Sequence, residues 1–206
     1  MKSSAPTIEF WFDFSSTYSY LSIMRIEEMA LARGISMVWR PFLLGPIFQS
    51  FGWTTSPFLN QPIKGRYMWH DLERRSAKYG LPFRQPDIFP QTSTLPARIA
   101  LLAAELPWIG TYCRHVTTQN FAAGLDISNE ENVVAALDGL VAKPGLFITA
   151  ALSDANKSLL RTQTEEALRR GIFGAPSFTV GKELFWGDDR LEDALDFCVN
   201  ERKSHE

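Results

Sequence analysis

The feature that most constrains the fold is a strand–helix–strand pattern at the start of the sequence. Residues 8–14 (IEFWFDF) form a short apolar run rich in aromatic side chains, which is typical of a strand buried on both faces. Residues 17–33 show helical spacing of apolar side chains, and Gly34 follows as a common residue just past a helix end. Residues 35–42 then predict a second strand. A unit of this length is expected to hold its two strands parallel, joined by a right-handed crossover.

The middle of the chain has a different character. Residues 44–61 contain several Gly and Pro residues and predict a segment that is mostly loop. Beyond it, up to about residue 150, the pattern is helical and no strand pattern occurs. The predicted helices cover residues 64–79, 94–106 and 108–123, about ten residues opened by the capping box Ser128-Asn-Glu-Glu131, and a short stretch after Pro144-Gly145. This part of the chain therefore reads as an all-helical insertion.

Strand patterns return near the end of the chain. A long helix is predicted over residues 154–170, ended by Gly171. Residues 177–180 and 183–186 predict a hairpin joined by a two-residue turn with glycine first. A last helix follows, for which we expect an aspartate as N-cap.

The order of these elements predicts an α/β protein with a thioredoxin-like fold and an inserted all-helical domain. Ala175-Pro176 precedes a short strand, as the cis-proline does in thioredoxin-type folds. The predicted thioredoxin-like domain is discontinuous and comprises residues 1–44 and 154–206. The predicted helical domain comprises residues 45–153.

The first strand-to-helix turn carries Ser16, where folds of this type usually carry a reactive cysteine. Serine cannot form a disulfide, so dithiol oxidoreductase chemistry at this turn is excluded. The two cysteines, Cys113 and Cys198, lie far apart, form no CxxC pair and are expected to be buried, so neither a dithiol centre nor a zinc site is predicted. Chemistry at this turn would therefore use a sulfur that the protein does not own.

Four segments, in this order and spacing, carry a family resemblance. They are Phe12-Asp-Phe-Ser-Ser16-Thr-Tyr-Ser-Tyr20, Lys64-Gly-Arg-Tyr67 with Asp71-Leu72, Gly174-Ala-Pro-Ser-Phe178, and Phe185-Trp-Gly-Asp-Asp-Arg-Leu191. The chain resembles the 2-hydroxychromene-2-carboxylate isomerases and the related kappa-class glutathione transferases, within the DsbA-like thioredoxin superfamily. It departs from the family pattern at Thr17, where proline is frequent, and at Asp188, where Asn or Ser is frequent. These departures bear on the substrate more than on the fold or the thiol cofactor.

The resemblance implies glutathione as cofactor and Ser16 as the catalytic residue. A serine hydroxyl at a helix N-terminus can donate to a bound thiolate, and the unpaired backbone N–H groups of that terminus add positive potential. The implied reaction is isomerisation of 2-hydroxychromene-2-carboxylate or a similar intermediate of aromatic catabolism. It would proceed by thiolate addition, rotation about the bond that has become single, and expulsion of the thiolate.

The resemblance and the local patterns also predict the residues that hold the ligands. The predicted glutathione-binding residues are Ser16, Ala175, Pro176, Trp186, Gly187, Asp188 and Asp189. An extended peptide can pair beside a cis-proline, and the start of the last helix with Asp188 or Asp189 would receive the γ-glutamyl carboxylate and ammonium groups. Asp188 as a plain N-cap is an alternative role. Asn60, Lys64 and Phe89 are predicted to contact the second substrate, whereas a solvated helix face is the alternative for Lys64.

Two other functions remain open from the sequence. A kappa-like transferase or peroxidase would share the thiolate site and consume glutathione. A thioredoxin-fold binding or chaperone-like module without catalysis is the other alternative.

Composition and the ends of the sequence bear on the partners and on the setting. The formal net charge is −2 without a long basic run, which argues against nucleic-acid partners. No apolar stretch reaches the roughly 18–20 residues that span a bilayer, and no signal-peptide core is present. We therefore expect a cytoplasmic protein without membrane partners that acts on a small aromatic substrate with glutathione. The resemblance implies a homodimer.

Overall fold

A computed structural model describes residues 5–204, with side chains described to residue 201. Its core is a four-stranded sheet in the order β2-β1-β3-β4. The strands are β1 (Thr7–Phe12), β2 (Ser36–Pro41), β3 (Ser177–Val180) and β4 (Glu183–Trp186). β1 pairs parallel with β2 and antiparallel with β3, and β3 and β4 form a hairpin. The predicted parallel unit and the predicted hairpin are both confirmed.

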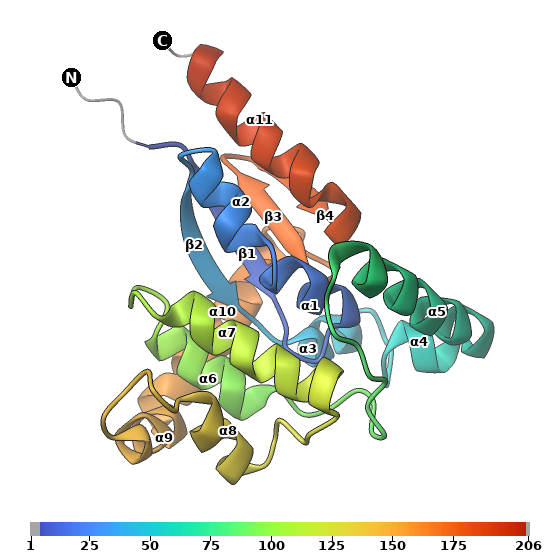
Figure 1. Cartoon of the computed structure of the whole chain (residues 1–206), viewed down its shortest axis with the longest axis vertical. Coiled ribbons are helices and arrows are strands. Elements are labelled where there is room, and N and C mark those ends of the chain that lie inside the picture. The colour runs from blue at the N-terminus through green and yellow to red at the C-terminus, as the bar shows by residue number, and fades with distance from the viewer. Residues whose placement is uncertain (1–4, 205–206) are drawn as a thin grey trace.

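Helices surround this sheet (Figure 1). They are α1 (Thr17–Ile23), α2 (Ile26–Ala32), α3 (Leu44–Ser50), α4 (Pro57–Asn60), α5 (Pro62–Tyr79), α6 (Thr94–Leu102), α7 (Ile109–Thr118), the π-helix η1 (Gln119–Ala123), α8 (Glu130–Ala136), α9 (Pro144–Leu152), α10 (Asp154–Arg169), the 3₁₀-helix η2 (Asp188–Arg190) and α11 (Leu191–Ser204). Figure 1 shows α6 to α9 gathered at one end of the sheet, and α4 and α5 to one side beyond α1.

Alternation along β1 distributes its side chains between two buried clusters. Phe10 and Phe12 belong to the larger cluster, which also contains side chains of α2, α6, α7 and α11. Trp11 points to the opposite face and packs with Phe42 and with Ala167 of α10. Both faces of β1 are therefore covered, as its continuous apolar sequence predicts.

The helix predicted over residues 17–33 is divided into α1 and α2. The break falls at Met24 and Arg25, where the backbone N–H of Arg25 donates to the carbonyl of Ser22 at 3.1 Å, three residues back. The break turns the Arg25 side chain toward the start of α11, where it is paired with Asp188.

The prediction of loop over residues 44–61 is wrong, because α3 and α4 lie there. Pro46 and Pro57 stand in the first turns of these helices, where a missing N–H costs nothing. The N–H of Leu44, in the first turn of α3, donates to the Asp13 carboxylate at 2.7 Å. The cap of α8 also differs from the prediction, because Asn129 and not Ser128 accepts from the first-turn N–H groups.

Within the described residues, all strands lie outside 45–153, as predicted. The division into a discontinuous thioredoxin-like domain and a helical domain stays a prediction. The larger buried cluster joins the two segments, since it includes Ala97, Ile99 and Tyr112 together with the strand residues. Across residues 5–204 we find no helix with the length and apolarity that crossing a membrane requires.

Candidate functional site

Ser16 lies at the N-cap of α1, in an extended conformation with φ −81° and ψ 120°. Its hydroxyl accepts from the backbone N–H of Ser19 at 3.2 Å and donates to the carbonyl of Ala175 at 2.8 Å. The Ala175–Pro176 peptide bond is cis, as the sequence predicts. The two ends of the chain, separated by 159 positions, therefore meet at this hydroxyl.

A buried carboxylate, Asp13, holds the turn that carries Ser16. One carboxylate oxygen of Asp13 accepts from the N–H and the hydroxyl of Ser15, both at 2.9 Å, and from the Ser93 hydroxyl at 2.6 Å. The other oxygen accepts from the N–H of Leu44. Asp13 is only 2% exposed and its partners are neutral donors, so the turn is fixed by its own hydrogen bonds and by hydrogen bonds from two distant residues, Leu44 and Ser93. Sequence reasoning assigned Asp13 no role, although an aspartate two residues before a serine is the signature of an Asx-turn.

The π-helix η1 supports the same turn from the helical segment. Its Asn120 is buried, and the side-chain amide donates to the carbonyl of Phe14 at 3.1 Å. The side-chain oxygen of Asn120 has no hydrogen-bond partner in the described part of the chain. Single π-turns are frequent at functional sites, and this one places the Asn120 amide against Phe14, two residues before Ser16.

The residues around the cis-proline are joined to the start of the last helical segment. The N–H of Gly187 donates to the carbonyl of Pro176 at 2.9 Å. Gly187 has φ +111°, a conformation that side chains rarely adopt, so glycine is required there. The Trp186 indole lies against Gly174, where any added Cβ would collide with it, and the indole is half exposed. Ala175, Pro176, Trp186 and Gly187 are therefore contiguous with Ser16.

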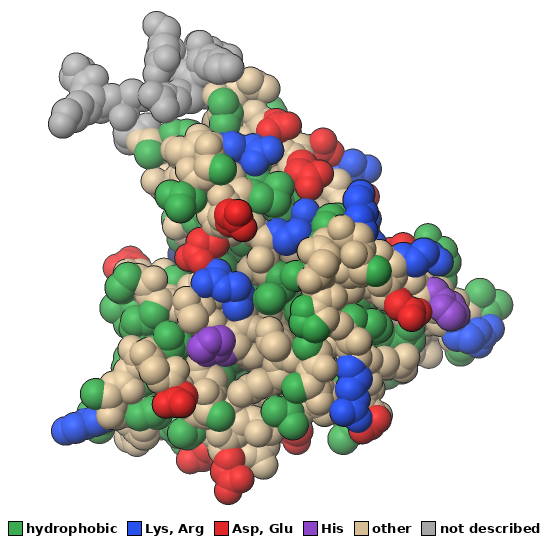
Figure 2. Space-filling view, viewed as in Figure 1, with side chains coloured by type: hydrophobic (Ala, Val, Ile, Leu, Met, Phe, Trp, Pro, Cys, Tyr) green, Lys and Arg blue, Asp and Glu red, His purple; other side chains and the backbone are tan. Residues whose placement is uncertain are grey.

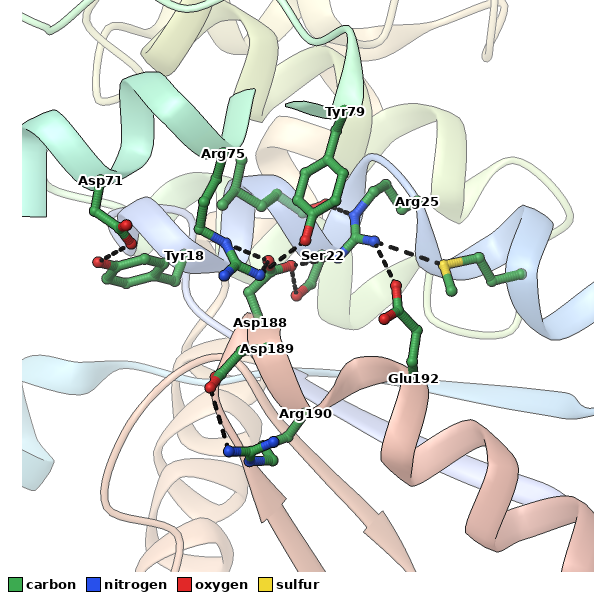
Figure 3. Close-up of polar contacts among 12 residues, drawn as sticks. Tyr18, Ser22, Arg25, Asp71, Arg75, Tyr79, Asp188, Asp189, Arg190 and Glu192 are labelled. Carbon is green, nitrogen blue, oxygen red and sulfur yellow. Dashed lines mark hydrogen bonds and ion pairs between the residues drawn. The ribbon is translucent and has the colours of Figure 1, made fainter. Parts of the chain in front are cut away.

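Asp188 and Asp189 have different surroundings (Figure 3). The Asp188 carboxylate is completely buried and accepts from Ser22, Arg25 and Arg75. Its side chain caps no helix, because Gly187 is the N-cap of η2, so the predicted N-cap role is wrong. The Asp189 side chain is 56% exposed and lies 3.6 Å from Arg190. Asp188 as a whole residue is therefore buried, whereas the carboxylate of Asp189 faces outward.

Lys64 and Asn60 are exposed near the junction of α4 and α5. The Lys64 ammonium lies 5.8 Å from the centre of the Phe58 ring, and that ring centre lies 6.5 Å from the ring centre of Tyr18. Because Tyr18 follows Ser16 by two residues, this chain of contacts links Lys64 to the Ser16 turn. The Asn60 side chain makes no hydrogen bond to these residues within the described part of the chain.

Tyr18 is a further polar group beside this turn, to which sequence reasoning gave no role. Its hydroxyl donates to Asp71 of α5 at 3.0 Å. Burial, together with the charge of Asp71, raises the pKa of Tyr18 far above its usual value. The phenol is therefore a proton-bearing donor throughout the physiological pH range.

Phe89 lies apart from these residues. Its ring packs edge-on against Trp69, with centres 4.8 Å apart. Trp69 lines a surface groove of about 500 Å³ that is bounded by α5 and residues 83–85. The structure therefore places the Phe89 ring next to Trp69, at this groove.

The two thiols of the protein are removed from any such chemistry. Cys113 and Cys198 are both free and buried, as predicted. Burial raises the pKa of both thiols, and it raises that of Cys113 most. Thiolate is the reactive form of cysteine, so neither residue is a nucleophile at neutral pH.

These observations define a class of protein: a thioredoxin-like sheet with a cis-proline facing a strand-to-helix turn that carries serine. Such a protein cannot exchange disulfides through this turn. A family model described as a DSBA-like thioredoxin domain matches residues 7–197, and the chain belongs to that family.

Two relatives and one solved structure show which members of this family the chain is similar to. The chain is 27% identical to the 2-hydroxychromene-2-carboxylate isomerase of Sphingobium xenophagum, covering 90% of this chain and 94% of the relative. It is 30% identical to glutathione S-transferase kappa 2 of Caenorhabditis elegans, covering 93% and 91% respectively. A solved structure of a 2-hydroxychromene-2-carboxylate isomerase superposes with a TM-score of 0.85 at 23% identity, covering 97% of this chain and 99% of that chain. The predicted fold and family resemblance are therefore confirmed.

Proposed function

We propose that this protein is a glutathione-dependent isomerase of 2-hydroxychromene-2-carboxylate or a similar intermediate of aromatic catabolism. The observation that carries the proposal is the hydrogen bond from Ser16 to the carbonyl of the cis-peptide residue Ala175. It places a hydroxyl donor beside a backbone segment suited to pairing with a peptide, in a protein whose own thiols are buried.

The residues present fit a peptide thiol. Among the described residues the backbone N–H groups of Ala175, Asp188 and Asp189 have no acceptor, and the Asp189 carboxylate is exposed. A free N–H at Ala175 can pair with a peptide carbonyl, and the N–H groups at residues 188 and 189 can receive a carboxylate. Asp189 would pair with an ammonium group. These groups match the cysteinyl and γ-glutamyl parts of glutathione.

Ser16 would change its hydrogen bond when the cofactor binds. The carbonyl of Ala175 accepts the Ser16 proton in this structure and has a second lone pair for a ligand N–H. A ligand N–H at this carbonyl satisfies it, so the hydroxyl can rotate toward a neighbouring sulfur. Because α1 has only seven residues, we assign the stabilisation of the thiolate mainly to this hydroxyl and not to a helix dipole.

Bound glutathione supplies a thiolate that adds to the conjugated system of the substrate, permits rotation about the resulting single bond, and is then expelled unchanged. Lys64 would attract the substrate carboxylate, with Asn60 beside it. Pro176 and Trp186 would form the floor and one wall of the glutathione site. Phe89, whose ring packs against Trp69, is also proposed to contact the substrate.

The test is an assay of the purified protein with 2-hydroxychromene-2-carboxylate, with and without glutathione. We expect isomerisation that requires glutathione, leaves its concentration constant and is about fivefold to tenfold slower in Ser16→Ala. Isomerisation at an equal rate without glutathione would contradict the proposal.

A kappa-like transferase or peroxidase is the second candidate, favoured by the 30% identity to the kappa-class relative. Conjugation of chlorodinitrobenzene with stoichiometric loss of glutathione, and no isomerisation, would establish it instead. A protein that has neither activity and does not bind glutathione in calorimetry would instead be a binding module without catalysis.

Two further parts of the proposal concern setting and assembly. We propose a cytoplasmic protein, because cytosol supplies the small thiol, and a homodimer. Large apolar side chains are exposed along α3 to α5 and offer a surface for association: Phe51, Trp53, Leu59, Ile63 and Tyr67. Nucleic acid is not a proposed partner, since Lys and Arg are interspersed with Asp and Glu on the face shown in Figure 2. Light scattering of the purified protein measures the oligomeric state.

A further inference from the structure

Four charged side chains from separate elements meet at the start of the last helical segment. Asp188 lies at their centre, in contact with Arg25 at 2.9 Å and with Arg75 at 2.7 Å. Arg25 also pairs with Glu192 at 3.1 Å. Two positive and two negative charges therefore form a neutral group, which we call the Asp188 cluster. Figure 3 shows Ser22, Arg25 and Arg75 converging on this carboxylate.

The hydrogen bonds of the Asp188 carboxylate exhaust its capacity as an acceptor. One oxygen accepts from Ser22 and Arg25, both at 2.9 Å. The other accepts two N–H groups of Arg75, at 3.2 and 2.7 Å. A carboxylate offers about four lone-pair sites, and all of them are occupied by protein donors. The Asp188 side chain therefore has no free site for a ligand ammonium.

The two guanidinium groups are themselves held in place by Tyr79. Arg25 stacks on the Tyr79 ring, 3.7 Å from its centre, and Arg75 donates to the Tyr79 hydroxyl at 2.8 Å. The exposed fractions of the Arg25 and Arg75 side chains are 13% and 24%, so neither is a free surface charge. Planar guanidinium groups that are stacked and paired in this way fix the direction of their carboxylate partner.

The contacts of Asp188 hold the turn of backbone around it in place. Gly187 is attached to the carbonyl of Pro176, and Asp188 is attached to α1 and α5. The turn that presents the free N–H groups and the Asp189 carboxylate is therefore held from both sides. We infer that Asp188 is a positioning residue for the γ-glutamyl end of glutathione, and that Arg25 and Arg75 are the groups through which it acts.

This inference rests on the proposed function and separates the groups that contact the ligand from the side chain that positions them. Asp189 and the backbone of residues 188 and 189 contact the ligand, and the Asp188 side chain contacts only protein. Arg75 is on α5, the helix whose first turn carries Lys64. The Asp188 cluster therefore also fixes the helix of the second-substrate side relative to the glutathione side.

The test compares two ligands, glutathione and cysteinylglycine, the same thiol without its γ-glutamyl group. Their dissociation constants are measured by calorimetry for the wild type and for the double variant Asp188→Asn/Arg75→Leu. The double variant removes one positive and one negative charge, so Arg25 keeps Glu192 as its partner. We expect glutathione to bind about tenfold more weakly, while cysteinylglycine binds within twofold of the wild-type value. A merely structural role would weaken both ligands together.

Two further variants complete the design. Arg75→Lys keeps the charge but cannot make the two-pronged contact, so we expect about threefold weaker glutathione binding even if the double variant fails to fold. Arg33→Leu is the matched control, because Arg33 forms an exposed ion pair with Asp196 of α11, and we expect it to bind glutathione as the wild type does. An unchanged ratio of the two dissociation constants in Arg75→Lys and in the folded double variant would overturn the inference and leave the proposed function standing. Absence of glutathione binding by the wild type would overturn both.

Discussion

Removal of the Ser16 hydroxyl tests the central element of the site. A free cysteine thiol has a pKa of about 8.5, and we expect the pKa of bound glutathione to be lower in the wild type. A hydrogen bond to a charged acceptor contributes about 1.5–3 kcal/mol, and a neutral one about 0.5–1.5 kcal/mol. Ser16 gives up the neutral bond to Ala175 to make the charged one. The net gain is therefore about 1–1.5 kcal/mol, which corresponds to about one pKa unit.

The measurement follows from this difference. Titration of the thiolate absorbance of bound glutathione in the ultraviolet should give a pKa about one unit higher in Ser16→Ala than in the wild type. At neutral pH the fraction of thiolate, and with it kcat, should fall by about fivefold to tenfold.

Two controls separate this effect from loss of stability. Ser16→Ala also removes the N-cap of α1, which costs about 1 kcal/mol, so Tm should fall by about 2–4 °C. Ser15→Ala removes the neighbouring hydroxyl that donates to Asp13, so it should lower Tm and leave the pKa of the bound thiol unchanged. An equal thiol pKa in Ser16→Ala and the wild type, with glutathione still bound, would refute the reasoning.

Three other predictions concern the rest of the molecule. Because burial raises the pKa of Cys113 and Cys198, iodoacetamide at neutral pH should label neither residue in the folded protein and both in urea; labelling under native conditions contradicts the structure. Burial raises the pKa of Glu9, but its contacts with Arg40, Thr179 and Arg170 lower the pKa by more, so the net pKa lies below the usual value of 4.5. The stability that the ionised Glu9 contributes to the fold is therefore present above pH 4.5 and is lost as the pH falls through the lowered pKa. Urea denaturation should therefore show Glu9→Gln to be about 1 kcal/mol less stable than the wild type near pH 7, with a gap that closes in acid. Asp13→Asn turns an amide N–H toward the N–H of Leu44, so it should cost about 2 kcal/mol in the same assay and weaken glutathione binding; equal stability would show that the turn does not need the charge.

The parts of the fold that could be predicted from the sequence depend on neighbouring residues. The alternation and turn chemistry of residues 177–186 are local, so the hairpin was predictable. The loop prediction for residues 44–61 failed because Gly and Pro were taken as breakers, whereas prolines occupy first turns and Asp13, 31 positions earlier, accepts from the Leu44 N–H.

The candidate site shows the same limit. The meeting of Ser16 with Ala175-Pro176 was predictable, since each motif has its own signature. The burial of Asp188 was not predictable, because its partners Arg25 and Arg75 lie 163 and 113 positions away in the sequence. No sequence pattern relates residues at such separations. A pair of acidic residues before a helix has the same local pattern whether one of them faces inward or outward.

The hydrogen bond between Ser16 and Ala175 also has a consequence for synthesis of the protein. A ribosome adds about 5–20 residues per second, so Ala175 emerges roughly 10–30 seconds after Ser16. During that interval β1 can pair with β2, but its other edge awaits β3, because β3 is the second neighbour of β1 in the sheet. An open edge rich in aromatic residues invites association with other nascent chains. Only a chain that extends beyond β3 can close this edge and bring Ala175 to Ser16, so a chain that stops before β3 would lack the proposed activity.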